Sequence, residues 1–246
     1  MGRTFENRKH AMAKRGDRDA KAFTRAGRLI SMAVKAGGPD PDANPALRRA
    51  VQNARAVNMP KDRIQAAIDK ASGAGDGESY EEILYEGYGP FGVAILVETA
   101  TDNPTRTVAN VRAAFKKENG NLGTTGSVSF MFDRLGVFQV QPEAIEGIGK
   151  DELELELIDH GLEEMFEDTD DRDRPVWVIR CAREGFGALQ AALEAKGIEP
   201  RSSGMEWLPK TTTPIDEAQA EEIRGLVDRL EQDDDVQKVF TNAEVS

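Results

Sequence analysis

The sequence has few of the residues from which covalent cross-links, metal cages and base-stacking platforms are built. Cys181 is the only cysteine in 246 residues, which excludes an intrachain disulfide and a thiolate metal cage. Aromatic residues make up 6% of the chain. No apolar run approaches the roughly 20 residues of a membrane span, and residues 1–6 lack the apolar core of a signal peptide. We therefore expect a cytoplasmic protein without a membrane partner.

Catalytic groups are equally scarce. An enzyme needs a convergent set of reactive side chains, but His10 and His160 are far apart in the sequence and neither lies in a nucleophile motif. The glycine-rich segment 120–127 lacks the Gly-Lys-Ser/Thr ending of a phosphate loop. Residues 151–173 are acidic but lack the glycine and closing glutamate of a calcium loop. The sequence predicts no enzymatic activity, no metal site and no cofactor.

Charge is distributed unevenly along the chain, whose net charge is −12. Residues 1–75 contain 16 Lys and Arg against 7 Asp and Glu, whereas residues 76–246 contain 16 against 37. A basic segment on an acidic chain attracts a polyanion locally and repels it elsewhere. Residues 1–75 are therefore the candidate nucleic-acid-binding region.

Helical periodicity places many of these basic residues on helix faces. From Ala20 to Lys35 the apolar residues share one side, and the cations lie within roughly 80° of one another on the opposite side. Arg48 and Arg55 oppose the apolar face of the next helix. The first 20 residues have too few apolar side chains to fold alone, so we expect a flexible basic arm there. The candidate nucleic-acid-binding residues are Arg3, Arg8, Lys9, Lys14, Arg15, Lys21, Arg25, Arg28, Lys35, Arg48 and Arg55.

Clustered Lys and Arg residues are typical of phosphate-binding surfaces, because each contact with a phosphate releases a condensed counterion. Any solvated helix face also carries such residues. The aromatic residues of this region are Phe5 and Phe23. A stacking platform for single strands is therefore not expected, and Phe23 is assigned to the core.

Two short helices follow this basic helix, with Asn44 as the expected cap of the first and Pro45 in its first turn. The corner between the two helices is unusual because it places an apolar methionine beside a lysine, where a plain turn would use Gly or Asp. We predict that this corner is a partner-contact loop. Its residues are Asn58, Met59, Pro60 and Lys61.

The acidic remainder of the chain predicts two α/β units. Residues 83–132 have the order ββαβ, with strands at 83–88, 93–99 and 127–132. Residues 137–208 have the order βαββαβ, which is typical of a ferredoxin-like domain. A C-terminal helix capped by Asp216 and a strand at Val236–Phe240 would complete the first unit.

The predicted fold class is α+β, with an N-terminal helical domain followed by two ferredoxin-like α/β domains, the last inserted into the second. The predicted boundaries are 1–76 for the basic helical domain, 77–133 plus 205–246 for the first α/β domain, and 134–204 for the inserted acidic domain.

Several motifs resemble those of the YebC/PmpR family. They are Asn44-Pro45 with Leu47-Arg48, Asn58-Met59-Pro60-Lys61-Asp62, Tyr85-Glu86-Gly87-Tyr88-Gly89-Pro90, Thr101-Asp102-Asn103, Gly120-Asn121-Leu122-Gly123, Gly126-Ser127-Val128 and the stretch 236–242. The resemblance runs essentially end to end and implies the same three-domain fold. It departs at the N-terminus, where family members usually carry Gly-His-Ser-Lys-Trp and this chain has Gly2-Arg3-Thr4-Phe5-Glu6.

The family resemblance implies a regulator of gene expression without enzymatic activity. Members are described as DNA-binding transcriptional regulators, and the family includes the mitochondrial translational activator of cytochrome oxidase. The leading interpretation is a DNA-binding transcriptional regulator that works with the transcription machinery. The alternatives are a ribosome-associated translation factor that binds ribosomal RNA, and an adaptor whose basic region docks an acidic protein. Nothing in the sequence specifies an oligomer.

Overall fold

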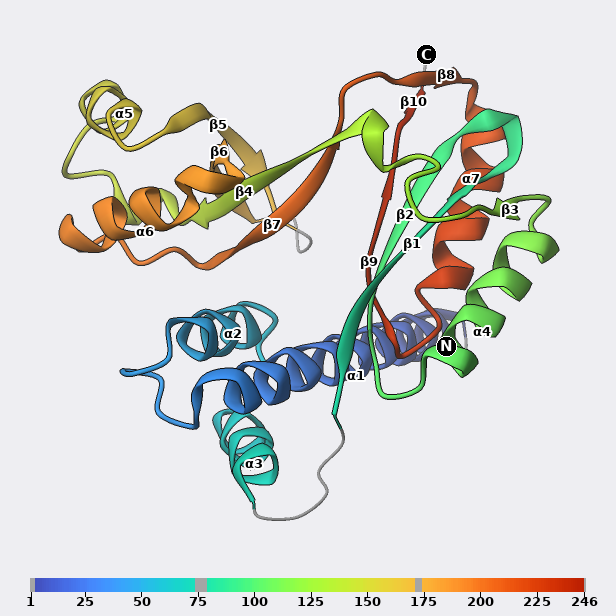
Figure 1. The fold of residues 1–246 in the computed structure, drawn as a ribbon, viewed down its shortest axis with the longest axis horizontal. Helices are drawn as coiled ribbons and strands as arrows, with labels where there is room; N and C mark the ends of the chain where they lie inside the picture. Colours follow the sequence, from blue (N-terminus) through green and yellow to red (C-terminus); the bar gives the residue numbers. More distant parts are fainter. Residues whose placement is uncertain (1–2, 74–78, 171–173, 246) are drawn as a thin grey trace. The chain divides into compact units, whose positions relative to one another are not determined.

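The computed structural model describes residues 3–73, 79–170 and 174–245, of which residues 3–18 are described by their backbone alone. The chain forms two compact units. Unit 1 comprises Met1–Val128 and Thr213–Ser246, and unit 2 comprises Ser129–Thr212. N-terminal helices are followed by two antiparallel sheets with helices packed on them, so the predicted α+β class is confirmed (Figure 1). No helix in the described ranges is long and apolar enough to cross a bilayer.

The head, as we call residues 3–73, consists of three helices: α1 (Arg3–Gly37), α2 (Pro45–Ala56) and α3 (Lys61–Ser72). Helix α1 begins at Arg3, so the segment that we expected to be a flexible arm continues the helix. Apolar residues of all three helices, among them Ile30, Leu47 and Ile64, form one buried cluster. The head therefore has a core of its own.

Asn44 holds the corner between α1 and α2, as the capping pattern predicted. Its side-chain oxygen accepts a hydrogen bond from the backbone N–H of Leu47 at 3.1 Å. Its amide nitrogen donates to the carbonyl oxygens of Ala33 at 2.7 Å and Gly38 at 2.9 Å. Since Asn44 is buried, these bonds satisfy polar groups that would otherwise be costly to bury.

The first sheet belongs to unit 1 and has the strand order β3-β1-β2-β9, with each neighbouring pair antiparallel. Helices α4 and α7 pack on one of its faces, where Ile95, Phe115 and Leu226 share a core (Figure 1). Strand β9 pairs with β2, so it completes a sheet that begins about 150 residues earlier in the sequence. A parallel pair, β8 and β10, lies beside it. The bounds are β1 Glu81–Tyr88, β2 Ala94–Thr101, α4 Pro104–Lys117, β3 Asn121–Leu122, β8 Thr213–Ile215, α7 Glu217–Leu230, β9 Val236–Thr241 and β10 Ala243–Val245.

The prediction of a strand at 127–132 is wrong. The third strand of the first sheet is the short β3, and Ser129–Met131 forms a 3-10 turn. Glu86 explains the difference, because its buried carboxylate accepts the backbone N–H groups of Gly126 at 2.7 Å and Val128 at 2.9 Å. Backbone donors that bind a carboxylate are not available to a strand ladder.

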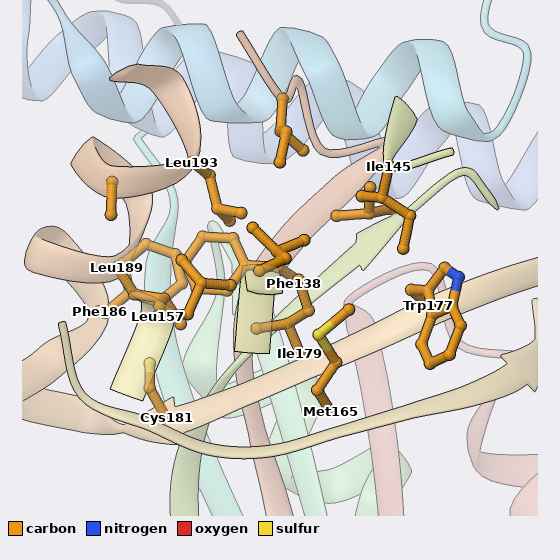
Figure 2. Packing of buried hydrophobic residues seen from close by; sticks show 14 residues of the cluster. Phe138, Ile145, Leu157, Met165, Trp177, Ile179, Cys181, Phe186, Leu189 and Leu193 are labelled. Atoms are coloured by element: carbon orange, nitrogen blue, oxygen red, sulfur yellow. The ribbon is translucent and has the colours of Figure 1, made fainter. Parts of the chain in front are cut away.

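Unit 2 contains the second sheet, whose strand order β5-β6-β4-β7 and element order βαββαβ are those of a ferredoxin-like domain. Figure 2 shows its core, in which the rings of Phe138 and Phe186 are stacked with centroids 4.5 Å apart. Cys181 is buried in this core, and burial is the main cause that raises the pKa of its thiol to about 11. The bounds are β4 Phe132–Val140, α5 Lys150–Ile158, β5 Leu162–Thr169, β6 Pro175–Ala182, α6 Phe186–Ala195 and β7 Ser202–Pro209, with 3-10 turns at Pro142–Ala144 and Arg183–Gly185. Another 3-10 turn, Pro90–Gly92, belongs to unit 1.

Candidate nucleic-acid interface

Three residues that were predicted to bind nucleic acid lie on one face of α1, which we call the α1 face: Lys21, Arg25 and Arg28. Two of them bind the C-terminal end of α7. Lys21 Nζ donates to the carbonyl oxygen of Gln232 at 3.2 Å, and Arg25 Nη2 donates to that of Glu231 at 2.9 Å. Carbonyl oxygens at a helix C-terminus carry partial negative charge and favour cations. Burial lowers the pKa of Arg25, and the carboxylates of Glu231 and Asp234 oppose that shift.

Arg28, the third residue of the α1 face, binds a buried carboxylate. Its Nη1 donates to Asp235 Oδ1 at 2.5 Å and to the carbonyl oxygen of Ala100 at 2.7 Å. The side chain of Arg28 is 13% exposed and that of Asp235 is 2% exposed. The guanidinium also lies 5.1 Å from the ring centroid of Tyr80. Arg28 therefore fastens the head to the first sheet.

Asp235 is the centre of a wider network that the sequence did not reveal. Arg106 Nη2 donates to both of its carboxylate oxygens, at 3.0 and 2.7 Å, and Thr107 Oγ1 to one of them at 2.6 Å. Thr101 Oγ1 lies 3.2 Å from the same oxygen. Burial alone would raise the pKa of Asp235, but the hydrogen bonds from Thr107, Arg106 and Arg28 outweigh it and hold that pKa at about 2.

The placement of the α1 face corrects the expectation of an open cationic stripe. Lys21, Arg25 and Arg28 share a face as predicted, but that face lies against the first sheet and the end of α7. Periodicity identified the shared face correctly, and only the fold shows what it contacts.

Helix α2 presents two predicted arginines to solvent. Arg48 and Arg55 are both exposed and lie within about 20° of each other around the helix axis. Within the described ranges, neither side chain forms a hydrogen bond or an ion pair. Lys35 is exposed in the last turn of α1. The side chains of Arg3, Arg8, Lys9, Lys14 and Arg15 lie outside the described part of the chain.

The corner between α2 and α3 also differs from its prediction. Met59 is 8% exposed and belongs to the head core, so it is a packing residue and not an apolar group at a tip. Asn58 has a φ of 63°, in the left-handed region that asparagine tolerates, which turns the chain so that Met59 points inward. Pro60 and Lys61 are exposed, with Pro60 at the cap of α3.

Two other sequence predictions concern aromatic and glycine-rich segments. Phe23 packs against the head core, and the Arg63 guanidinium lies 5.6 Å from its ring centroid, so the ring is not a free stacking surface. At the end of the glycine-rich segment, the N–H groups of Gly126 and of Val128, which follows the segment, already donate to the carboxylate of Glu86. That arrangement leaves those two donors unavailable to a phosphate.

Sequence reasoning missed one basic element. Helix α4 carries Arg106, Arg112, Lys116 and Lys117 and no Asp or Glu, although residues 76–246 as a whole are strongly acidic. Counting charge over individual helices, instead of over the whole acidic remainder, would have found it.

These observations define a class of protein: an α+β chain with a helical, basic head fastened to an α/β sheet unit, and a ferredoxin-like unit whose sequence is inserted between those of β3 and β9. Family models match nearly the whole chain. The TACO1/YebC protein N-terminal domain matches residues 3–74, and the TACO1/YebC second and third domain matches residues 80–243. The chain belongs to the TACO1/YebC family, as its motifs indicated.

Curated relatives agree with this assignment. A protein of Anaeromyxobacter dehalogenans (strain 2CP-C) is 58% identical over 242 residues, covering 98% of this chain and 99% of the relative. A protein of Myxococcus xanthus is 56% identical over 98% of this chain and 99% of its own length, and one of Flavobacterium johnsoniae is 52% identical over 98% of each. Each is named "Probable transcriptional regulatory protein".

A solved structure has the same fold. The crystal structure of a conserved hypothetical protein, Aq1575, from Aquifex aeolicus superposes with a TM-score of 0.77 at 36% sequence identity. The match covers 92% of this chain and 90% of that chain.

Proposed function

We propose that this chain is a DNA-binding transcriptional regulator that acts in the cytoplasm without enzymatic activity and contacts phosphates through the exposed face of α2. The names of its relatives support a regulator of gene expression. The observation that carries the proposal is the pair Arg48 and Arg55. These arginines are exposed, share one face of α2 and have no partner in the described ranges, within a region of 16 basic and 7 acidic residues.

Phosphate contact is the chemistry that best fits this pair. A guanidinium binds phosphate oxygens through paired N–H donors, and each contact releases a condensed counterion from duplex DNA. The scarcity of exposed aromatic side chains in the described part of the head argues against binding by base stacking.

The direct test is the salt dependence of binding to a labelled duplex of about 30 base pairs, measured by fluorescence anisotropy with the full chain. For Arg48→Gln combined with Arg55→Gln, we expect the slope of log K against log salt to fall by about 2, since each phosphate contact contributes about 0.9. Affinity at about 0.1 M salt should drop roughly tenfold or more.

A matched control removes the same charge elsewhere. Arg183→Gln combined with Arg224→Gln also deletes two exposed arginines, and its slope should stay near that of the wild type. Equal slopes for the α2 variant and the wild type would overturn the assignment of α2 as the phosphate contact. Failure of the wild-type chain to bind duplex DNA at low salt would overturn the proposed function itself.

The nature of the bound nucleic acid is tested in cells by crosslinking followed by sequencing. Enrichment of promoter DNA supports transcriptional regulation. Enrichment of large-subunit ribosomal RNA would instead indicate a role in translation. Recovery of neither nucleic acid would favour an adaptor that binds an acidic protein.

A further inference from the structure

Helix α4 is a basic element in an acidic part of the chain. It carries four basic residues and no acidic one, whereas residues 76–246 together hold 16 basic and 37 acidic residues. Arg106 is engaged by Asp102 at 2.7 Å and by Asp235. The other three residues, which we call the α4 face, are exposed: Arg112, Lys116 and Lys117.

No interaction within the described ranges accounts for the α4 face. Arg112, Lys116 and Lys117 form no side-chain hydrogen bond or ion pair there. Lys116 and Lys117 occupy the last turn, where the helix dipole favours cations, but Arg112 lies a turn earlier. Arg112 and Lys116 are also an i,i+4 pair of like charge, an arrangement that destabilises a helix. Repulsion between Arg112 and Lys116 therefore opposes the favourable dipole interaction of the last turn, and the dipole does not explain the position of Arg112.

The packing of α4 fixes where the α4 face points. Val111, Ala114 and Phe115 are buried in the core of unit 1 and lock the rotation of the helix. By helical period, Arg112 and Lys116 lie about 40° apart on the opposite, solvent side. The charges are thus held on a rigid element, which reduces the entropy lost when a ligand is bound.

A shallow groove between α4 and α7 borders the α4 face. The groove has a volume of about 330 Å³, and its walls include Lys117, Arg229 and Gln232. The backbone carbonyl of Gln232 is the group that binds Lys21 of α1. The groove also contains Asp233, whose carboxylate accepts a hydrogen bond from Asn110 at 2.8 Å. Lys117 of α4 and Arg229 of α7 therefore line the same groove, and Arg229 is also paired with Glu118.

We infer that the α4 face is a second contact for the sugar-phosphate backbone of duplex DNA, in addition to Arg48 and Arg55 on the exposed face of α2. This inference rests on the proposed function and adds a site outside the head. Charge complementarity selects the occupant, because α4 carries three cations that are unpaired within the described ranges and no acidic residue between Pro104 and Lys117, which suits a chain of phosphates. The α4 face contains no aromatic side chain and therefore cannot stack on bases. Its contacts would position the protein along the sugar-phosphate backbone of the duplex.

The test uses the full chain and the same labelled duplex. In the variant Arg112→Gln, Lys116→Gln, Lys117→Gln, we expect the slope of log K against log salt to fall by about 2 to 3. The control variant Arg183→Gln, Lys210→Gln, Arg224→Gln removes the same charge from other exposed positions. Its slope should change by less than about 0.5. Circular dichroism and the denaturation midpoint establish that both variants are folded.

The outcomes separate this inference from the proposed function. A wild-type chain that binds duplex DNA, combined with α4 and control variants of equal slope, overturns the α4 contact and leaves the α2 contact intact. A selective loss in the α4 variant supports the inference. A wild-type chain that binds no duplex DNA overturns both.

Discussion

The cationic faces of α1 and α2 look alike in the sequence and differ in the structure. Each places basic residues opposite an apolar stripe. On α1 they contact backbone carbonyls and a buried carboxylate, whereas on α2 Arg48 and Arg55 remain exposed. A cationic helix face is therefore as suitable for docking on a helix C-terminus as for binding a polyanion. The difference lies in what the rest of the chain places opposite it.

The largest effect should come from the carboxylate that fastens the α1 face. Asp235→Asn removes the charge shared by Arg28 and Arg106, so we expect the free energy of unfolding of unit 1 to fall by about 3 kcal/mol. Urea denaturation measures this loss. Asp102→Asn is the control, because Asp102 pairs with the same Arg106 on the surface, and its effect should stay below about 1 kcal/mol. Equal losses in the two variants would contradict the central role of Asp235.

Acid should remove the same contribution. The pKa of Asp235 is about 2 in the folded chain, below the value near 3.9 of an unfolded aspartate. Its stabilisation is therefore complete above about pH 4 and shrinks as the pH falls towards 2. The difference in urea midpoint between wild type and Asp235→Asn should narrow between pH 5 and pH 2. A constant difference across that range would show that the charge of Asp235 is not what stabilises unit 1.

A smaller effect is expected from the contact between α1 and α7. Arg25→Met removes a charged hydrogen bond to a helix C-terminus and should lower the free energy of unfolding by about 1–2 kcal/mol. Arg48→Met provides the comparison on α2. If both substitutions had the same effect on stability, the distinction between the two faces would not hold.

The smallest effect on stability belongs to α2. Because Arg48 and Arg55 are exposed, the variant Arg48→Gln, Arg55→Gln should unfold within about 0.5 kcal/mol of the wild type while its DNA-binding salt slope falls. Denaturation and anisotropy on the same preparation measure both quantities. A large loss of stability would mean that α2 also docks within the protein.

Local features were predictable from the sequence because local chemistry determines them. Asn44 and Pro45 defined the start of α2, and the order βαββαβ defined the second sheet. Nonlocal features were not. Nothing around Ser127 shows that Glu86, about 40 residues earlier, binds the neighbouring N–H groups and prevents a strand. Met59 looked exposed for the same reason, since the left-handed turn at Asn58 determines which side of the corner faces the core.

The pairing of Arg28 with Asp235 also has a consequence for folding during translation. The two residues are 207 positions apart, so α1 is synthesised long before Asp235. Until residues 231–235 have been translated, the carboxylate of Asp235 and the carbonyl oxygens that hold Lys21 and Arg25 do not exist. The nascent chain thus carries an uncovered cationic helix until those residues have been made. Translation of residues 231–235 changes the electrostatic surroundings of α1.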